Sequence, residues 1–194
     1  MAMGGTMRQV WVGLRFLAVM TLALGILYPL AVFGVGRLVP SVADGSFVTD
    51  ANGSVVGSRL IGQSFTGSTW FWPRPSAAGT GYDAESSGGS NLSADNRALV
   101  QLVHARLVRV ASADGVAPGL IPSDAVTASA SGLDPDISPA YAMLQVARVS
   151  RARGLDTRTV AALVQQETQG RLLGFIGEPH VNVLALNLAL SRLT

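Results

Sequence analysis

FLAVMTLALGILYPLAVFGVG, residues 16–36, is a run of 21 residues without a charged side chain, bounded by Arg15 and Arg37. An α-helix rises about 1.5 Å per residue, so a helix of this length spans roughly 30 Å, the thickness of the hydrocarbon core of a bilayer. We therefore predict one transmembrane anchor helix, with its ends at residues 11 and 38, that remains part of the mature chain.

Two other interpretations of this run are open. It could be the buried core helix of a soluble protein. It could also be the apolar part of a signal peptide cleaved near Ser41-Val42-Ala43, whose small residues resemble a cleavage site. Signal peptides usually carry a shorter apolar region of about 7–15 residues, and Arg37 lies between the run and the candidate site. Both features favour an uncleaved anchor.

Small residues and one proline interrupt the apolar run. Pro29 would be costly inside a soluble helix, but membrane helices tolerate proline where neighbouring groups satisfy the carbonyl that it leaves free. Glycine on a membrane helix lets a second helix approach closely. We expect the helix to pack against a partner helix through Gly25, Pro29, Gly34 and Gly36.

The positive charges that flank the run predict its orientation. Arg8 and Arg15 precede it, whereas only Arg37 follows closely. Arginine and lysine are enriched on the cytoplasmic side of membrane proteins. We expect residues 1–10 to lie in the cytoplasm and residues 39–194 to form one soluble domain outside it.

The composition excludes several classes of protein. The chain of 194 residues has no Cys, no Lys and only two His. It therefore has neither a disulfide framework nor a thiolate metal site, and we expect no metal and no tightly bound cofactor. From residue 38 onward, eleven Arg stand against twelve Asp and Glu. Nucleic-acid-binding domains carry a concentrated positive charge, so we expect no nucleic-acid partner.

The domain after the anchor mixes strand and helix signals. Residues 46–65 are rich in Val, Ile and Phe, and Asn52-Gly53 within them is the favoured two-residue hairpin turn. Residues 66–92 are crowded with Gly, Ser and Pro and predict loops. Together these elements predict an α+β fold, with a single N-terminal transmembrane helix followed by one mixed α/β extracytoplasmic domain. Helices are predicted at 93–112, 139–153 and 156–170 and from Pro179 onward.

A helical face rich in Gln and Arg is the first candidate binding site. Tyr141, Gln145 and Arg148 are spaced i, i+4 and i+7, so they share one face of the predicted 139–153 helix. Arginine forks and a glutamine amide suit an anion, a nucleotide or an acidic partner surface. A solvated face that pairs with local acids would explain the same pattern. Further arginines follow close by, at Arg151, Arg153 and Arg158.

Two other groups of residues are candidates. The segment Trp70–Arg74 combines aromatic side chains with Arg, which are enriched in interface hot spots, although Trp also anchors ordinary cores. Asp134, Asp136 and His180 would serve a membrane-tethered hydrolase as acids and base. For the two carboxylates the favoured interpretation is a place before a helix, where they complement its free amides. For His180, expected in the first turn of the last helix, a surface or capping role is favoured over catalysis. We assign no catalytic residue.

Six blocks of sequence occur in a fixed order: GSRLIGQSF (57–65), RPSA (74–77), SGGSNL (87–92), TASASGLDPDISP (127–139), QVARVSRARGL (145–155) and GEPHVNVLALNLAL (177–190). These blocks, together with an N-terminal span that contains Tyr28-Pro29, closely resemble the C-subunit family of the bacterial Kdp potassium-transporting P-type ATPase. The resemblance covers roughly residues 8–193, nearly the whole chain.

This resemblance implies a non-catalytic subunit that is needed to assemble an ATP-driven, high-affinity potassium importer in the inner membrane. Its partners would be a channel-like subunit that carries the potassium, a P-type subunit that hydrolyses ATP, and a small membrane subunit. The family's C subunit is also proposed to act as a catalytic chaperone that raises the affinity for ATP, with the Gln that matches Gln145 as the nucleotide contact. A tethered exported hydrolase and an anion- or nucleotide-binding module are the alternatives.

The predicted orientation bears on this nucleotide contact. With the N-terminus in the cytoplasm, Gln145 would lie on the outer side of the membrane, away from cytoplasmic ATP. The face that holds it would then be better suited to a partner subunit. The residues that we expect at partner interfaces are Gln63, Trp70, Arg74, Ser76, Tyr141, Gln145 and Arg148.

Overall fold

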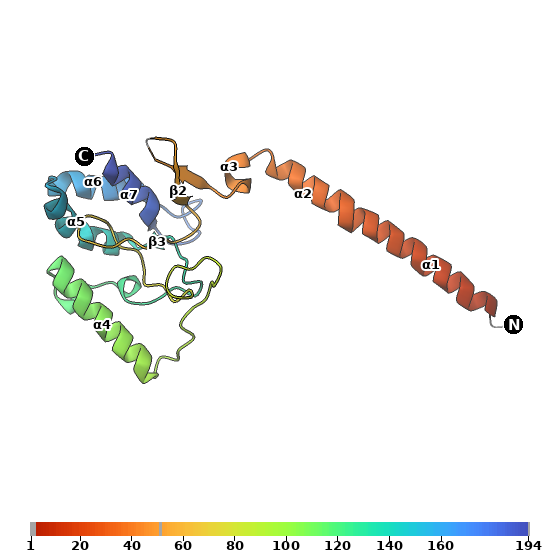
Figure 1. Ribbon diagram of the computed structural model, residues 1–194, viewed down its shortest axis with the longest axis horizontal. Helices are drawn as coiled ribbons and strands as arrows, with labels where there is room; N and C mark the ends of the chain where they lie inside the picture. The colour runs from red at the N-terminus through yellow and green to blue at the C-terminus, as the bar shows by residue number, and fades with distance from the viewer. Residues whose placement is uncertain (1–2, 51, 194) are drawn as a thin grey trace. The chain divides into compact units, whose positions relative to one another are not determined.

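The structure, a computed structural model, describes residues 3–50 and 52–193. The chain forms two compact units, one that ends at Ser46 and one that begins at Phe47 (Figure 1). This division falls after residue 38, the predicted end of the anchor, and the first unit also includes the short helix α3 (Pro40–Ala43). One long apolar helix and one mixed domain of helices and small sheets make up the predicted α+β class.

The long helix of the first unit consists of α1 (Met3–Leu22), η1 (Ala23–Leu27) and α2 (Tyr28–Gly36), which follow one another without a break. The 32 residues Gly5–Gly36 are long and apolar enough to cross a membrane. The helix therefore begins before residue 11, the predicted start. Its large apolar side chains are exposed along its whole length, as at Leu24, so it is not the buried core helix of a soluble fold.

A widened turn accommodates Pro29 within this helix. The turn η1 is π-helical, and the Tyr28 N–H donates to the Ala23 carbonyl five residues earlier. Proline has no N–H to donate, and in a regular helix its ring clashes with the carbonyl four residues before it, here that of Gly25. An extra residue in the turn just before the proline relieves this clash and lets the helix continue.

A short hairpin opens the second unit. Strands β1 (Phe47–Thr49) and β2 (Val55–Ser58) are antiparallel. The turn is longer than the two residues predicted at Asn52-Gly53, because the Asp50 N–H donates to the Ser54 carbonyl and the Asp50 carboxylate accepts the Ser54 N–H at 2.9 Å. Gly53 has φ +81°, a conformation that glycine adopts without steric cost.

Helix α4 (Arg97–Asp114) begins and ends later than the predicted 93–112. Its start is fixed by Asn96, whose side chain accepts the Ala98 N–H at 2.8 Å. Its end is fixed by Gly115, which has a left-handed conformation. Two short 3-10 turns follow, η2 (Pro118–Leu120) and η3 (Ser123–Ala125).

The C-terminal part of the unit surrounds a small antiparallel sheet with the strand order β3-β5-β4. Helix α5 (Pro139–Arg153) has the predicted boundaries, because Ser138 caps its start and Gly154 ends it in a left-handed conformation. The other elements are β3 (Asp136–Ile137), α6 (Thr157–Glu167), β4 (Thr168–Gln169), β5 (His180–Asn182) and α7 (Val183–Ser191).

Two further predicted helix boundaries are also wrong. The helix predicted at 156–170 ends at Glu167, because the next two residues pair with β5 as strand β4. The last helix begins at Val183 rather than near Pro179, because His180–Asn182 form the central strand of the sheet. Asn182 then caps α7, and its side chain accepts the Ala185 N–H at 3.1 Å.

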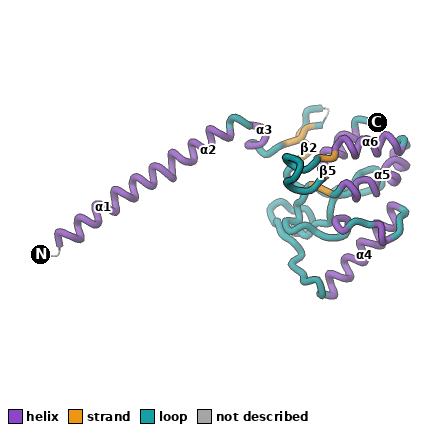
Figure 2. The backbone as a smooth tube through the Cα atoms, turned by 180° about the vertical axis from the view of Figure 1, so that it is seen from behind, coloured by secondary structure: helices purple, strands orange, loops and turns teal. Residues whose placement is uncertain are grey.

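The core of the second unit lies among α5, α6, α7 and a segment of the long loop. Helix α5 packs against α6, and α6 packs against α7; Figure 2 shows α5 and α6 next to each other, with loops occupying much of the remaining unit. Phe71, in the middle of the loop-rich tract 66–92, is fully buried in this core together with Tyr141, Val149, Val160 and Leu186.

Candidate functional site

The segment around Phe71 is attached to the helices through its backbone. The Phe71 N–H donates to the side-chain oxygen of Asn187 at 2.9 Å, and the amide nitrogen of Asn187 donates to the Phe71 carbonyl at 3.0 Å. The next residue is held in the same way: the Trp72 N–H donates to Gln145 Oε1 at 2.6 Å, and Gln145 Nε2 donates to the Trp72 carbonyl at 3.1 Å. The side-chain amides of Asn187 in α7 and Gln145 in α5 thus pair with the backbone N–H and carbonyl groups of this segment, as a neighbouring strand would in a sheet.

Gln145 is fully enclosed by these contacts. Its side chain is 0% exposed, and its Oε1 also accepts Arg148 Nη2 at 2.6 Å. Tyr141, on the same face of α5, is also buried, which raises the pKa of its hydroxyl. The face predicted from the i, i+4, i+7 spacing exists, but it lies against the Trp70–Trp72 segment and not on the surface.

Replacing Gln145 by Leu is expected to lower the free energy of unfolding of the second unit by roughly 1–3 kcal/mol, because the partly buried Trp72 N–H and carbonyl and the buried Arg148 Nη2 lose their partner. The matched control is Gln165→Leu, at an exposed position of α6. Urea unfolding of the full chain in detergent, followed by tryptophan fluorescence, measures both variants. Equal stability of the two variants would contradict a structural role for the amide.

Arg148 connects the same segment to α4. Its Nε donates to Asp114 Oδ1 at 2.7 Å, and both side chains are almost completely shielded from solvent. Its guanidinium carbon lies 4.1 Å from the centre of the Trp72 ring, a geometry that favours cation–π attraction. Its Nη1 donates to three loop carbonyls, those of Gly67, Ser68 and Trp70.

Asp114 carries the negative charge of this buried pair. Burial raises the pKa of its carboxyl, and the hydrogen bond and the charge of Arg148 oppose that rise. Its second oxygen, Oδ2, is buried without a hydrogen-bond partner among the described residues. The Arg148–Asp114 pair therefore joins α4, α5 and the loop. Each of the two buried charges is compensated by the other.

Other arginines stack on the tryptophans of the segment. The guanidinium of Arg109 lies 4.8 Å from the Trp72 ring centre, and that of Arg153 lies 4.4 Å from the Trp70 ring centre. Arg153 Nε also donates to the Thr69 carbonyl at 2.7 Å. Two arginines of the cluster predicted from the sequence, Arg148 and Arg153, thus hold this chain's own loop.

The predicted interface residues Arg74 and Ser76 lie in a second group of contacts. Arg74 pairs with Asp134 at 2.9 Å. Ser76 donates to the Gly132 carbonyl at 2.6 Å and accepts the Tyr82 N–H at 2.8 Å. These bonds join two of the sequence blocks, 74–77 and 127–139. The remaining predicted residue, Gln63, is half-buried and lines an apolar cavity of about 270 Å³ with Trp70 and α7.

The carboxylates proposed for hydrolysis have other partners. Asp134 Oδ2 is engaged by Arg74, and Asp136 Oδ1 accepts Asn182 Nδ2 at 3.0 Å. His180 Nε2 lies 3.9 Å from Asp136 Oδ2. Burial raises the pKa of Asp136, and the hydrogen bond from Asn182 and the charge of His180 oppose the rise. Among residues 3–50 and 52–193 no group of three or more His, Cys, Asp or Glu side chains is placed to hold a metal ion.

Three residues of these networks could not be assigned from periodicity. Asp114 pairs with Arg148 across two helices, and Asp124 accepts both the N–H and the hydroxyl of Ser138. Asn187 is the one residue for which a signal existed. It is the only strongly polar side chain in VLALNLAL (183–190), and a polar group in such a helix needs a hydrogen-bonding partner inside the protein.

Comparison with known proteins gives a consistent result. The family described as KdpC, the c chain of the K+-transporting ATPase, matches residues 10–192. The potassium-transporting ATPase KdpC subunit of Kineococcus radiotolerans is 57% identical over 190 residues, which cover 98% of this chain and 96% of the relative. The subunit of the same name from Rhodospirillum rubrum is 52% identical over 176 residues, which cover 90% and 91%. The chain belongs to the KdpC family, the c chains of the K+-transporting ATPase.

Proposed function

We propose that this chain is a non-catalytic subunit that stabilises an ATP-driven, high-affinity potassium import complex in the inner membrane. Its place in the KdpC family carries the proposal, and the long apolar helix Gly5–Gly36 supports membrane anchoring. Its partners are a channel-like potassium-translocating subunit, a P-type subunit that hydrolyses ATP, and a small membrane subunit. A D-K-T-G phosphorylation sequence, which the P-type subunit requires, is absent from this chain, which contains no Lys.

The anchor has its N-terminus in the cytoplasm and the second unit on the outer side. Arg8 and Arg15 precede the apolar run. Arg37, which follows it, forms an ion pair with Asp44 at 3.0 Å, so its positive charge is partly compensated on that side. The imbalance of positive charge therefore favours a cytoplasmic N-terminus.

A cysteine at Ser112, an exposed position of α4, is expected to react with a membrane-impermeant maleimide in intact spheroplasts. The chain has no other cysteine, so the label reports this site alone. The control, Met7→Cys at the opposite end of the anchor, is expected to react only after lysis. The reverse pattern would contradict the orientation.

The anchor has open space for a partner helix. A Cβ atom added at Gly34 would meet nothing within 4 Å, and one added at Gly25 would meet only Thr21 Cγ2 at 3.9 Å. A Cβ atom added at Gly36 would lie 3.6 Å from the Ala43 Cβ of the same unit. We propose that Gly25, Pro29 and Gly34 face the channel-like subunit.

Replacing Gly34 by Leu is expected to reduce recovery of the channel-like subunit with this chain by about tenfold, the equivalent of ~1.4 kcal/mol of packing. The larger side chain has room in the isolated helix and obstructs only a close neighbour. Gly13→Leu is the matched control, because Gly13 is also open and lies outside the proposed contact. Quantitative immunoblotting of affinity-purified chain measures recovery, and equal yields from both variants would contradict the contact.

The finer role, raising the ATP affinity of the P-type subunit, is proposed here as an effect of assembly rather than of direct nucleotide contact at Gln145. A nucleotide that used this amide would have to displace the Trp72 backbone. The variants Gln145→Leu and Gln165→Leu separate the two possibilities in the assembled complex. Loss of ATP affinity in Gln145→Leu, with stability and assembly unchanged, would assign the nucleotide contact to Gln145.

A further inference from the structure

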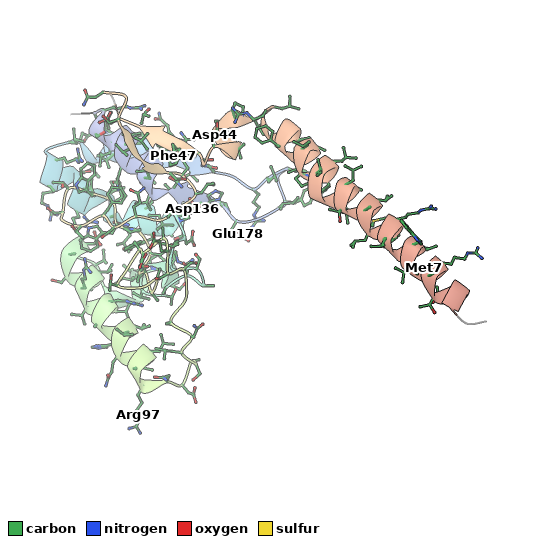
Figure 3. The ribbon with its side chains drawn as sticks, turned by 45° about the vertical axis from the view of Figure 1, so that its right-hand side comes forward. Met7, Asp44, Phe47, Arg97, Asp136 and Glu178 are labelled. Atoms are coloured by element: carbon green, nitrogen blue, oxygen red, sulfur yellow. The ribbon has the colours of Figure 1, made fainter. Side chains whose placement is uncertain are left out.

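The connection between β4 and β5 exposes an uncharged apolar turn. Between Arg171 and Glu178 the sequence reads LLGFIG. Figure 3 shows this segment, which ends at the labelled Glu178, projecting from the body of the second unit. Its four large side chains are strongly exposed: Leu172 67%, Leu173 76%, Phe175 73% and Ile176 47%.

This turn has a defined backbone. The N–H groups of Leu172 and Ile176 each donate to the other residue's carbonyl at 2.9 Å. Leu173 has φ +54°, a conformation that is unfavourable for a bulky residue, and Gly174 has φ +82°. Arg171 and Glu178 form an ion pair at 2.7 Å across the base. The fold thus holds the turn in a shape that turns its apolar side chains outward.

Such an arrangement is unfavourable in water. Single exposed apolar residues are common on protein surfaces, but contiguous apolar patches mark contact with a protein or a membrane. The fold has its own core, to which none of these four side chains contributes. Another surface must therefore cover the turn.

We propose that the turn 172–176 inserts into the interfacial layer of the same bilayer that the chain's own anchor crosses. This inference rests on the proposed membrane anchoring. The anchor ends at Gly36 and the second unit begins at Phe47, and the residues between them span at most about 35 Å even when fully extended. The second unit is therefore always tethered near a lipid surface, and tethering raises the effective concentration of its exposed turn there.

The chemistry of the turn fits a fluid apolar phase. The turn projects from the unit (Figure 3) and carries no charge between Arg171 and Glu178, so inserting it into lipid would bury no charged side chain. Leucine and phenylalanine are the side chains that interfacial segments bury at the boundary of headgroups and acyl chains. Arg171 and Glu178, at the base, mark where the apolar surface ends and the polar headgroups would begin.

The absence of cysteine from the chain allows a direct test. A nitroxide spin label is attached to a single cysteine at Leu173, and the full chain is reconstituted in vesicles of phosphatidylethanolamine and phosphatidylglycerol. Collision rates with oxygen, which concentrates in lipid, and with a water-soluble nickel chelate report the surroundings of the label. The oxygen-to-nickel ratio at Leu173 is expected to be several-fold higher than at Leu120, an equally exposed apolar residue of η2.

A second label, at Leu24 in the anchor, separates failure of this inference from failure of the proposed function. A lipid-like ratio at Leu24 with a water-like ratio at Leu173 overturns the inserted turn and leaves the anchor intact. A water-like ratio at Leu24 overturns the anchor, and the inserted turn with it. A label at Leu173 that becomes shielded from both reagents only when the other subunits are present shows that a protein surface covers the turn, which also overturns the lipid contact.

Discussion

Replacing Arg148 by Met is expected to lower the free energy of unfolding of the second unit by about 3–5 kcal/mol, because removing one partner of a buried ion pair leaves the other charge uncompensated. Asp114 is the group left behind, and its side chain is completely buried. The same change removes the donors to the loop carbonyls of residues 67, 68 and 70 and the cation that stacks on Trp72. A domain is stabilised by only about 5–15 kcal/mol in total, so this is a large loss.

The control for this variant lies on the same helix. Arg151 is exposed on α5, and Arg151→Met is expected to change the unfolding free energy by no more than about 0.5 kcal/mol. The double variant Arg148→Met with Asp114→Asn is expected to recover part of the loss, because the unpaired carboxylate is gone. All variants are measured by urea unfolding. If the effects of Arg148→Met and Asp114→Asn simply add, or if Arg148→Met and Arg151→Met are equally stable, the Arg148–Asp114 pair does not join the helices as described.

Replacing Leu24 by Arg is expected to prevent membrane insertion of the anchor and to abolish recovery of the complex. An Arg at the centre of a membrane helix costs about 2.5–3.5 kcal/mol on insertion scales. Leu24 lies within the apolar run, inside the π-helical turn η1, far from either polar end of the span. Alkaline extraction of membranes measures insertion, and affinity purification measures complex recovery.

The matched control for the anchor is Met7→Arg. This position is in the same helix but next to Arg8, on the side proposed to be cytoplasmic, where an additional positive charge supports the orientation. Insertion and complex recovery are expected to remain close to those of the unchanged chain. An alkali-resistant Leu24→Arg chain that still assembles would show that the run is not the membrane anchor.

The sequence predicts best the elements whose ends are set by neighbouring residues in the chain. Helix α5 has the predicted ends because Ser138-Pro139 begins it and Gly154 ends it. The apolar helix was also predictable, because its length and lack of charge need no tertiary information. By contrast, the strand β5 was missed. His180–Asn182 is strand only because β3 and β4, distant in sequence, lie on either side of it, and a three-residue strand has too short a pattern to identify.

In the candidate site, too, local features were predictable and contacts with distant residues were not. Spacing placed Tyr141, Gln145 and Arg148 on one face of a helix, but periodicity does not reveal what that face contacts. The Trp70–Trp72 segment, some seventy residues earlier in the chain, covers it. A polar face on a helix suggested solvent or a ligand, whereas the polar groups here pair with the backbone of a loop that covers them. Asn187, a single polar residue in an apolar helix, was the one sign in the sequence that a backbone segment pairs with these helices. Its side chain pairs with the Phe71 N–H and carbonyl.

If this chain works as a subunit of a potassium-transporting ATPase, the other subunits are recovered together with it. A C-terminally tagged chain is extracted in mild detergent from potassium-starved cells of its native organism, and the co-purifying chains are identified by mass spectrometry. We expect a multi-span channel-like protein and a P-type ATPase among them. Recovery of the chain alone, from cells shown to express both partners, would contradict it.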